Sequence, residues 1–138
     1  MKSLVLLSYA WLLILFPSCD AQAEDADITA AESVAIQWLA GIDAGEWGRC
    51  WDEASLLLQA QMDREHWVMV LSQSSDFLGQ MEERSLATSR LANPPAEDPE
   101  GVYAVFRFLA RHTRGTVKES LVLRLEGDSW RVVGYWLE

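Results

Sequence analysis

The chain has 138 residues, with 21 acidic and 11 basic side chains and a formal net charge of −10. A chain of this length forms one domain with a single hydrophobic core. The acidic balance argues against nucleic acid or anionic lipid as a partner of the whole surface. The two cysteines exclude a zinc site that is built from cysteine pairs.

The N-terminus has the pattern of an export signal. Lys2 precedes an uncharged apolar run of 13 residues, Leu4 to Phe16, which is too short to cross a bilayer core. Ala21-Gln22-Ala23 follows and has the small-x-small form that signal peptidase cleaves. These features predict a signal peptide over residues 1–23 and an exported, periplasmic protein. The structural alternative is a buried N-terminal helix.

Cys19 offers a second processing route. Bacterial lipoproteins are cut just before a cysteine that is then acylated, and Phe16-Pro17-Ser18 resembles their recognition sequence loosely. Acylation at Cys19 would anchor the protein to a membrane. Cleavage after Ala23 instead removes 23 of the 138 residues and leaves Cys50 as the single cysteine. We expect Cys50 to be a small buried residue, with a reactive thiol as the alternative.

Helices are predicted in the first half of the domain, after an acidic, mobile lead-in over residues 24–28. Thr29-Ala30-Ala31-Glu32 has the form of a capping box. From there apolar residues recur every three or four positions as far as Ile42, and Gly45 is the predicted stop. The domain is therefore expected to span residues 29–138.

Two more helices are predicted before any strand. The first covers 46–54, and the second covers 64–78, with Asp63 as its N-cap and Gly79 as its stop. The segment 55–62 is compatible with a helix or a strand, because its apolar run is too short to reveal a period.

Four strands are predicted in the second half. Residues 81–91 alternate weakly and are typical of an edge strand, and 93–101 form an acidic, proline-rich loop. Alternating apolar residues then run from 102 to 137, with turns at Arg114-Gly115 and Gly127-Asp128, and predict a three-strand antiparallel meander.

These turns fix a register for the meander. Phe106 is expected to lie across from Leu123, and Leu125 across from Trp130. Both pairings send the same apolar set to one face: Val102, Ala104, Phe106, Phe108, Ala110, Val117, Leu121, Leu123, Leu125, Trp130, Val132 and Trp136. Such a face needs a cover, which the helices can supply. We therefore predict an α+β fold, with two to three helices packed on one curved antiparallel sheet.

The order of elements resembles the cone of the nuclear transport factor 2-like fold, within the wider cystatin-like group. The chain is also similar to an uncharacterised secreted bacterial family catalogued as domain of unknown function 4019. Five stretches carry this resemblance: Ala35 to Leu39, Ile42 to Trp47, Cys50-Trp51-Asp52, Arg64 to Trp67 and Ser129 to Trp136. The resemblance covers about Ala31 to Leu137. Its motifs are tryptophans and glycines that pack and turn, so it implies a fold and a compartment and no activity.

The resemblance also implies a pocket between the concave sheet face and the helices. Glu119 is the one charged residue that the predicted register sends to this face, flanked by Ala110 and Trp136. A carboxylate in a poorly hydrated cleft can act as a general acid or base. The alternative is that Glu119 lies at the open rim, where it is solvated or meets a cation.

The other predicted pocket-lining residues are aromatic or small: Trp38, Phe106, Phe108, Gly134 and Trp136. Gly134 leaves room between its neighbours on the inward face. Either the sheet bends there or a ligand fills the gap.

No metal and no cofactor is predicted. His66 and His112 are the only histidines. A site made from this pair with Asp63 or Glu65 lacks the second histidine four residues along a helix that metal-binding motifs use.

The outer face of the predicted meander mixes cationic with apolar side chains. Its cations are five of the ten basic residues that remain after cleavage at Ala23: Arg107, Arg111, Lys118, Arg124 and Arg131. Tyr135 lies among the apolar residues of this face. The mixture predicts contact with a second copy or with an acidic protein partner. The alternative is a solvated face whose cations pair with Glu126 and loop acids.

We therefore predict an exported bacterial protein that serves as a non-catalytic binding or interaction module, through its outer face or by holding a small apolar ligand in the cone. The alternative is a pocket enzyme of the isomerase, dehydratase or hydrolase type that uses Glu119 for proton transfer. A cone filled by side chains favours the module, and a deep pocket containing Glu119 favours the enzyme.

Overall fold

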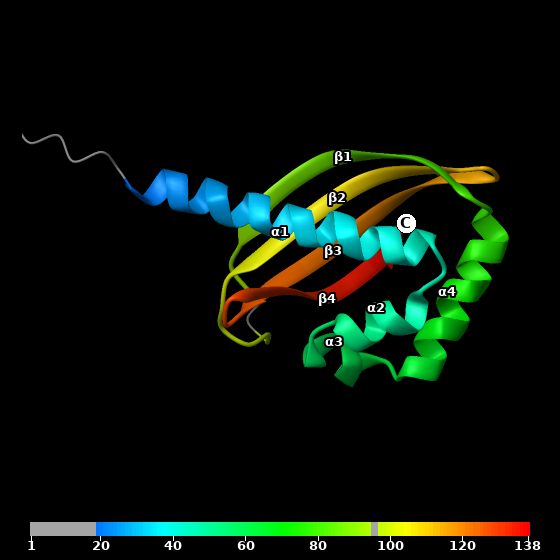
Figure 1. Cartoon of the computed structure of the whole chain (residues 1–138), viewed down its shortest axis with the longest axis horizontal. Coiled ribbons are helices and arrows are strands. Elements are labelled where there is room, and N and C mark those ends of the chain that lie inside the picture. Colours follow the sequence, from blue (N-terminus) through cyan, green and yellow to red (C-terminus); the bar gives the residue numbers. More distant parts are fainter. Residues whose placement is uncertain (1–18, 95–96) are drawn as a thin grey trace, which may run out of the picture.

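The structure is a computed structural model that describes residues 19–94 and 97–138, with side chains from Asp27 onward. The apolar run Leu4–Phe16 of the predicted signal peptide lies outside the described residues. Four helices precede a four-stranded antiparallel sheet, as Figure 1 shows. The predicted α+β class is confirmed.

The first helix, α1 (Cys19–Asp43), begins ten residues before the predicted start at Thr29. It runs through the predicted lead-in 24–28, so the expected capping box lies inside the helix, where the Ser33 hydroxyl donates to the main-chain oxygen of Thr29 at 3.1 Å. Composition explains the earlier start. Residues 19–31 include five alanines and four acids, which favour a helix and its N-terminal end.

The remaining helices are α2 (Trp47–Glu53), α3 (Leu56–Gln61) and α4 (Arg64–Leu78). α3 settles the ambiguous segment in favour of a helix, because Ser55 caps it by accepting from the Leu57 amide at 3.2 Å. Both predicted ends of α4 are confirmed. Asp63 accepts from the His66 amide at 2.9 Å, and Gly79 stops the helix with a φ of +78°.

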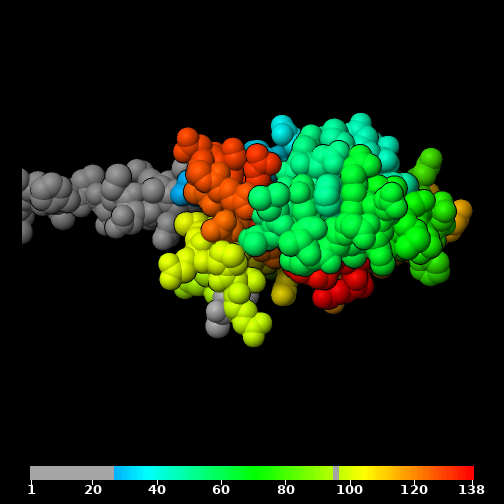
Figure 2. All heavy atoms as spheres, turned by 90° about the horizontal axis from the view of Figure 1, so that it is seen from below, coloured from blue at the N-terminus to red at the C-terminus, as the bar shows by residue number. Residues whose placement is uncertain are grey.

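The strands are β1 (Met81–Ala92), β2 (Tyr103–His112), β3 (Gly115–Glu126) and β4 (Ser129–Leu137), and they pair in chain order. Helix α1 lies across one face of this sheet, the inner face, while α2, α3 and α4 close the space beside β4 and at one end (Figure 1). In the described part of the chain no helix packs on the opposite, outer face. Figure 2 shows α4 in green with the end of β4 in red at the surface beside it.

The β2–β3 hairpin corrects the predicted register by two residues. His112 pairs with Gly115, so the turn is Thr113-Arg114, and Phe106 lies across from Leu121 instead of Leu123. A shift of two residues leaves every side chain on its predicted face. The inward set therefore survives the error.

Contacts outside the hairpin fix this turn. The Thr113 amide donates to the main-chain oxygen of Gln80 at 2.9 Å, and the Arg114 amide donates to that of Leu78 at 3.0 Å. These bonds tie the turn to the connection between α4 and β1. A local turn rule could not include them.

A β-bulge in β4 overturns the predicted orientations of Gly134, Tyr135 and Trp136, and it places Gly134 on the outer face, across from Val122. Leu125 pairs with Trp130 as predicted, but the register shifts between Val122 and Leu123, which adds one residue on β4. Beyond the bulge the two faces exchange. Tyr135, predicted on the outer face, points inward, and Trp136, predicted inside, points outward and is 50 % exposed.

Gly134 has a role different from both predicted ones. A Cβ atom at Gly134 would overlap with the indole of Trp136, so the glycine makes room for that ring. The ring lies over the backbone at the bulge, where no side chain competes with it. The space at Gly134 is filled by the protein itself.

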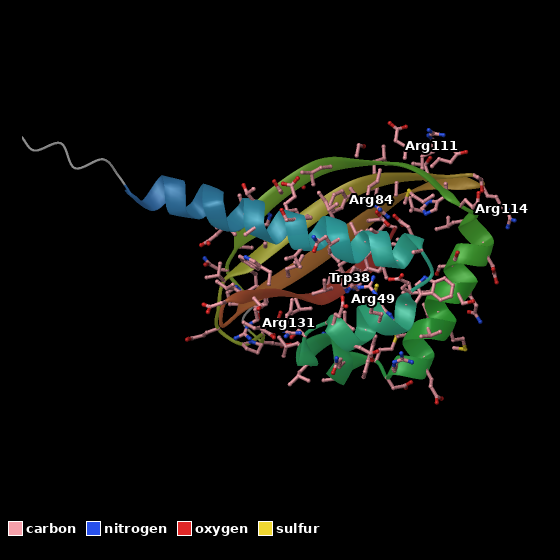
Figure 3. All side chains as sticks on the ribbon, viewed as in Figure 1. Trp38, Arg49, Arg84, Arg111, Arg114 and Arg131 are labelled. Carbon is pink, nitrogen blue, oxygen red and sulfur yellow. The ribbon has the colours of Figure 1, made fainter. Side chains whose placement is uncertain are left out.

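The core lies between α1 and the inner face. Ala31 and Ala35 are fully buried, and their small side chains let α1 approach the sheet closely. Trp38 and Leu39 on the same helix pack in the core and are at most 4 % exposed. Figure 3 shows Trp38 between α1 and the sheet. Its indole nitrogen donates to the main-chain oxygen of Cys50 at 3.0 Å, so the buried polar group is satisfied.

Cys50 occupies the predicted structural position. Its side chain is fully buried and free, and burial raises the pKa of the thiol to about 11. At neutral pH the group is therefore the protonated thiol, which is a poor nucleophile.

Candidate functional site

A cleft of about 660 Å³ opens at the end of the molecule where the β2–β3 hairpin meets α4. Its walls come from the last residues of α1, the start of α2, the second half of α4 and the ends of all four strands. Trp47, Leu71 and Leu78 supply apolar surface, while Glu119 and Tyr135 lie among the polar lining residues. The cleft is the place where sheet, helices and ionisable groups converge.

Glu119 lies at the inner end of this cleft and is 1 % exposed. Its carboxylate accepts from Arg84 Nε at 2.5 Å and from Arg84 Nη2 at 3.1 Å. It also accepts from the hydroxyl of Tyr135 at 2.7 Å. The register makes this meeting possible, because Arg84 lies across from Ala110 on the inward face and Glu119 lies across from Phe108.

Arg84 extends the network to α1. Its Nη1 and Nη2 donate to the two carboxylate oxygens of Asp43 at 2.7 and 2.8 Å. Figure 3 shows Arg84 between β1 and the C-terminal half of α1. One guanidinium thus joins the last turn of a helix to two strands.

Electrostatics favour the charged form of Arg84 and the neutral form of Tyr135 in this network. Burial opposes the charge on Arg84, but the hydrogen bonds and charges of Asp43 and Glu119 outweigh it and hold the pKa of the guanidinium above its ordinary value. Burial, reinforced by the negative charge of Glu119, raises the pKa of Tyr135 well above the ordinary range. Tyr135 is therefore a neutral hydrogen-bond donor.

This geometry differs from both expectations for Glu119. The residue is not at an open rim, because it is almost fully buried, yet it meets a cation as the structural alternative proposed. Both of its oxygens accept hydrogen bonds from the protein. An ion-paired carboxylate is a weak candidate for proton transfer, because protonating Glu119 would leave the buried charge of Arg84 without this partner.

The predicted aromatic lining packs inside the fold instead of around an open cone. Trp38, Phe106 and Phe108 are 4 %, 0 % and 5 % exposed. The ring centroid of Trp38 lies 5.4 Å from that of Tyr135, and those of Phe106 and Phe108 are 6.4 Å apart. Tyr135 thus takes the inner position that was predicted for Trp136.

Sequence reasoning missed Asp43, Arg84 and Tyr135 as members of the site. The inward position of Arg84 required the register of the weakly alternating strand β1, and that of Tyr135 required the bulge. One signal was available. Leu86, an apolar residue two positions after Arg84, shares its face, and the two lie across from the inward residues Phe108 and Ala110 of β2.

The two histidines lie far apart. His66 is in the first turn of α4, and His112 lines the cleft near the last turn of the same helix, roughly 18 Å away by helix rise. The Nδ1 atom of His112 is buried without a hydrogen-bond partner. Among the side chains of residues 27–94 and 97–138, no three His, Cys, Asp or Glu groups come together as metal ligands.

The predicted interface cations divide into two groups. Arg111 pairs with Glu82 and Glu83, and the other paired ones, Arg124 and Arg131, approach Glu126 at 3.6 and 3.8 Å. These three follow the solvated alternative.

Arg107 and Lys118 are different. Both are exposed, and in the described part of the chain neither has an acidic partner. They lie on the outer face of the sheet, where Arg107 pairs with Ser120 and Lys118 with Leu109.

None of the helices in the described ranges has both the length and the apolar character needed to span a membrane. Comparison with curated proteins and with solved structures finds no match. The nuclear transport factor 2-like cone therefore stays a prediction beyond the confirmed α+β class.

One protein family does match the chain. Its description is Protein of unknown function (DUF4019), and it covers residues 34–135, from the middle of α1 to the inward Tyr135. The chain therefore belongs to the DUF4019 family.

Proposed function

We propose that the protein is an exported, non-catalytic binding module whose binding surface is the outer face of the sheet. We define this outer face by six side chains: Val105, Arg107, Leu109, Lys118, Val122 and Trp136. The proposal rests on the presence of exposed apolar side chains next to exposed cations on this face. Leu109 is 47 % and Trp136 is 50 % exposed, beside two cations that have no acidic partner in the described residues.

The register makes these six residues one continuous patch. Arg107, Ser120 and Trp136 form a row across three strands, and Leu109 with Lys118 forms a neighbouring row. Strand spacing makes the patch roughly 10 Å wide and about 13 Å long. Its two exposed apolar side chains, Leu109 and Trp136, therefore adjoin the two cations, Arg107 and Lys118, on one surface instead of lying apart.

Charge selects the partner. The patch is cationic, whereas the whole chain has a net charge of −10. Two copies placed face to face would bring like charges together, which disfavours a symmetric dimer through this surface. An acidic protein segment with alternating apolar side chains complements both the charge and the period of the strands.

A synthetic decapeptide of alternating Glu and Val tests this proposal. We expect calorimetry to detect binding that weakens as salt rises, because the exposed charges are screened. Arg107→Glu should weaken the binding by about ten-fold, the effect of roughly 1.4 kcal/mol. Arg64→Glu changes the net charge equally on the helical side and should leave the affinity unchanged.

Two outcomes would contradict the proposal. Equal effects of Arg107→Glu and Arg64→Glu would mean that only net charge matters. Light scattering could instead detect a salt-sensitive dimer that dissociates in the Arg107→Glu variant. That result would assign the outer face to a second copy of the chain.

Export is supported by the sequence of residues 1–23 and is compatible with the packing of α1. Among the side chains described, those of α1 that contact the core begin at Ile28. Removal of everything before Glu24 or before Cys19 therefore leaves these contacts intact. The intact mass of protein from the periplasm should correspond to a chain that begins at Glu24. A mass that includes an acylated Cys19 would show a membrane anchor, and an unprocessed chain in the cytoplasm would refute export.

The alternative, a pocket enzyme, has one observation in its favour: Glu119 lines a cleft. The ion pair between Glu119 and Arg84 and the burial of the Glu119 side chain count against a proton-transfer role for this residue. Turnover that disappears in a folded Glu119→Gln variant would establish the enzyme and displace the module.

A further inference from the structure

We propose that the cleft at Glu119 is a second binding site, independent of the outer face, which takes a small organic cation: a primary ammonium group attached to an aromatic or aliphatic body. The volume of about 660 Å³ falls within the range of roughly 300–1,000 Å³ that small-molecule sites occupy. The inference depends on which hydrogen-bonding groups the protein leaves available inside.

The polar groups at the inner end are left with acceptor capacity. Tyr135 donates its single hydroxyl proton to Glu119 at 2.7 Å, so the phenolic oxygen has only lone pairs left to offer. Four of the N–H groups of Arg84 are directed at Asp43 and Glu119. An ammonium group has three donors and no acceptor, and it matches this arrangement.

Charge acts in the same direction. Asp43 and Glu119 share one guanidinium, which leaves this partly buried network with one formal negative charge. Arg114 lines the cleft too, but its guanidinium donates to the main-chain oxygen of Asp76, and Asp76, another lining residue, has the opposite formal charge. A monovalent cation would neutralise the remaining charge, and an anion would add to it.

Apolar walls lie beside these acceptors. Leu71 and Leu78 are 6 % and 8 % exposed, and both border the cleft. Trp47 also lines it, with its own indole N–H already donated to the main-chain oxygen of Ile42 at 3.0 Å. What the Trp47 side chain offers the cleft is therefore apolar and cation–π surface, with no free N–H donor. A ligand with a flat apolar body and one ammonium end can meet both parts.

Three probes with the same phenyl body test the proposal on the full chain: phenethylamine, 2-phenylethanol and 3-phenylpropionate. We expect phenethylamine to bind at least about ten-fold more tightly than the alcohol, with the carboxylate weakest of the three. Chemical-shift changes in NMR should centre on Trp47, Leu78 and Tyr135. Equal binding of the alcohol and the amine, or shifts confined to other surfaces, would overturn the assignment.

Two variants probe the site and keep both ion pairs of Arg84. Tyr135→Phe removes the phenolic acceptor and keeps the ring, and Asp76→Asn removes one negative charge at the mouth. Each should weaken the affinity for phenethylamine several-fold. Asp128→Asn, the same change in the exposed β3–β4 turn, should leave that affinity unchanged. If neither Tyr135→Phe nor Asp76→Asn differs from Asp128→Asn, the cation does not bind here. Arg107→Glu should leave this binding intact, which separates a failure of this site from a failure of the outer face.

Discussion

Replacement of Arg84 by Met is expected to destabilise the protein by about 3–5 kcal/mol, the usual cost of removing one partner from a buried ion pair. The side chain of Arg84 is 15 % exposed, and it compensates a carboxylate that is 1 % exposed. Without it, Glu119 would keep only the hydroxyl of Tyr135 as a partner. The last turn of α1 would also lose its link to the sheet through Asp43.

Urea unfolding followed by tryptophan fluorescence measures this cost. Arg64→Met is the matched control, because Arg64 also forms an ion pair, with Asp52, but both side chains are about half exposed. Surface pairs of this kind contribute little, so the control should unfold near the parent midpoint. If Arg84→Met does not fold, adding Glu119→Leu should restore folding by removing the uncompensated carboxylate. Equal midpoints for the two single variants would refute the importance of the network.

The sheet was largely predictable from sequence because alternation fixes which face a side chain takes, and faces tolerate an error of two residues. Phe106 was assigned to the wrong partner in β3 and still to the correct face. The two ends of α4 were predictable for a related reason. Asp63 and Gly79 act locally, through a cap and a left-handed stop.

The candidate site was predicted less well, because it depends on features without a local pattern. A single extra residue in β4 exchanges the sheet faces on which Tyr135 and Trp136 lie. The alternation of apolar residues in the sequence does not reveal where such a bulge occurs. The position of Arg84 in the site depends on the register of β1, an edge strand whose alternation is too weak to fix that register from sequence. Glu119 was located on the correct face, but its partners come from β1, β4 and the end of α1, which only the tertiary structure brings together.

Two identical substitutions should distinguish the packed interior from the exposed surface. Phe106 is fully buried between α1 and the sheet, and Phe77 on α4 is 79 % exposed. We expect Phe106→Ala to cost about 3–5 kcal/mol, since it removes a buried ring and leaves a cavity among fully buried neighbours such as Leu39 and Leu121.

Phe77→Ala should change the free energy of unfolding by less than about 0.5 kcal/mol, as surface substitutions usually do. Urea midpoints at equal m-values provide the measurement. Should Phe106→Ala fail to fold, Phe106→Leu keeps most of the volume and should still unfold at lower urea than Phe77→Ala. Because the proposal of a binding module assumes a filled interior, a Phe106→Ala variant as stable as the parent would mean that the space between α1 and the sheet is open, and would favour a ligand there over the outer face.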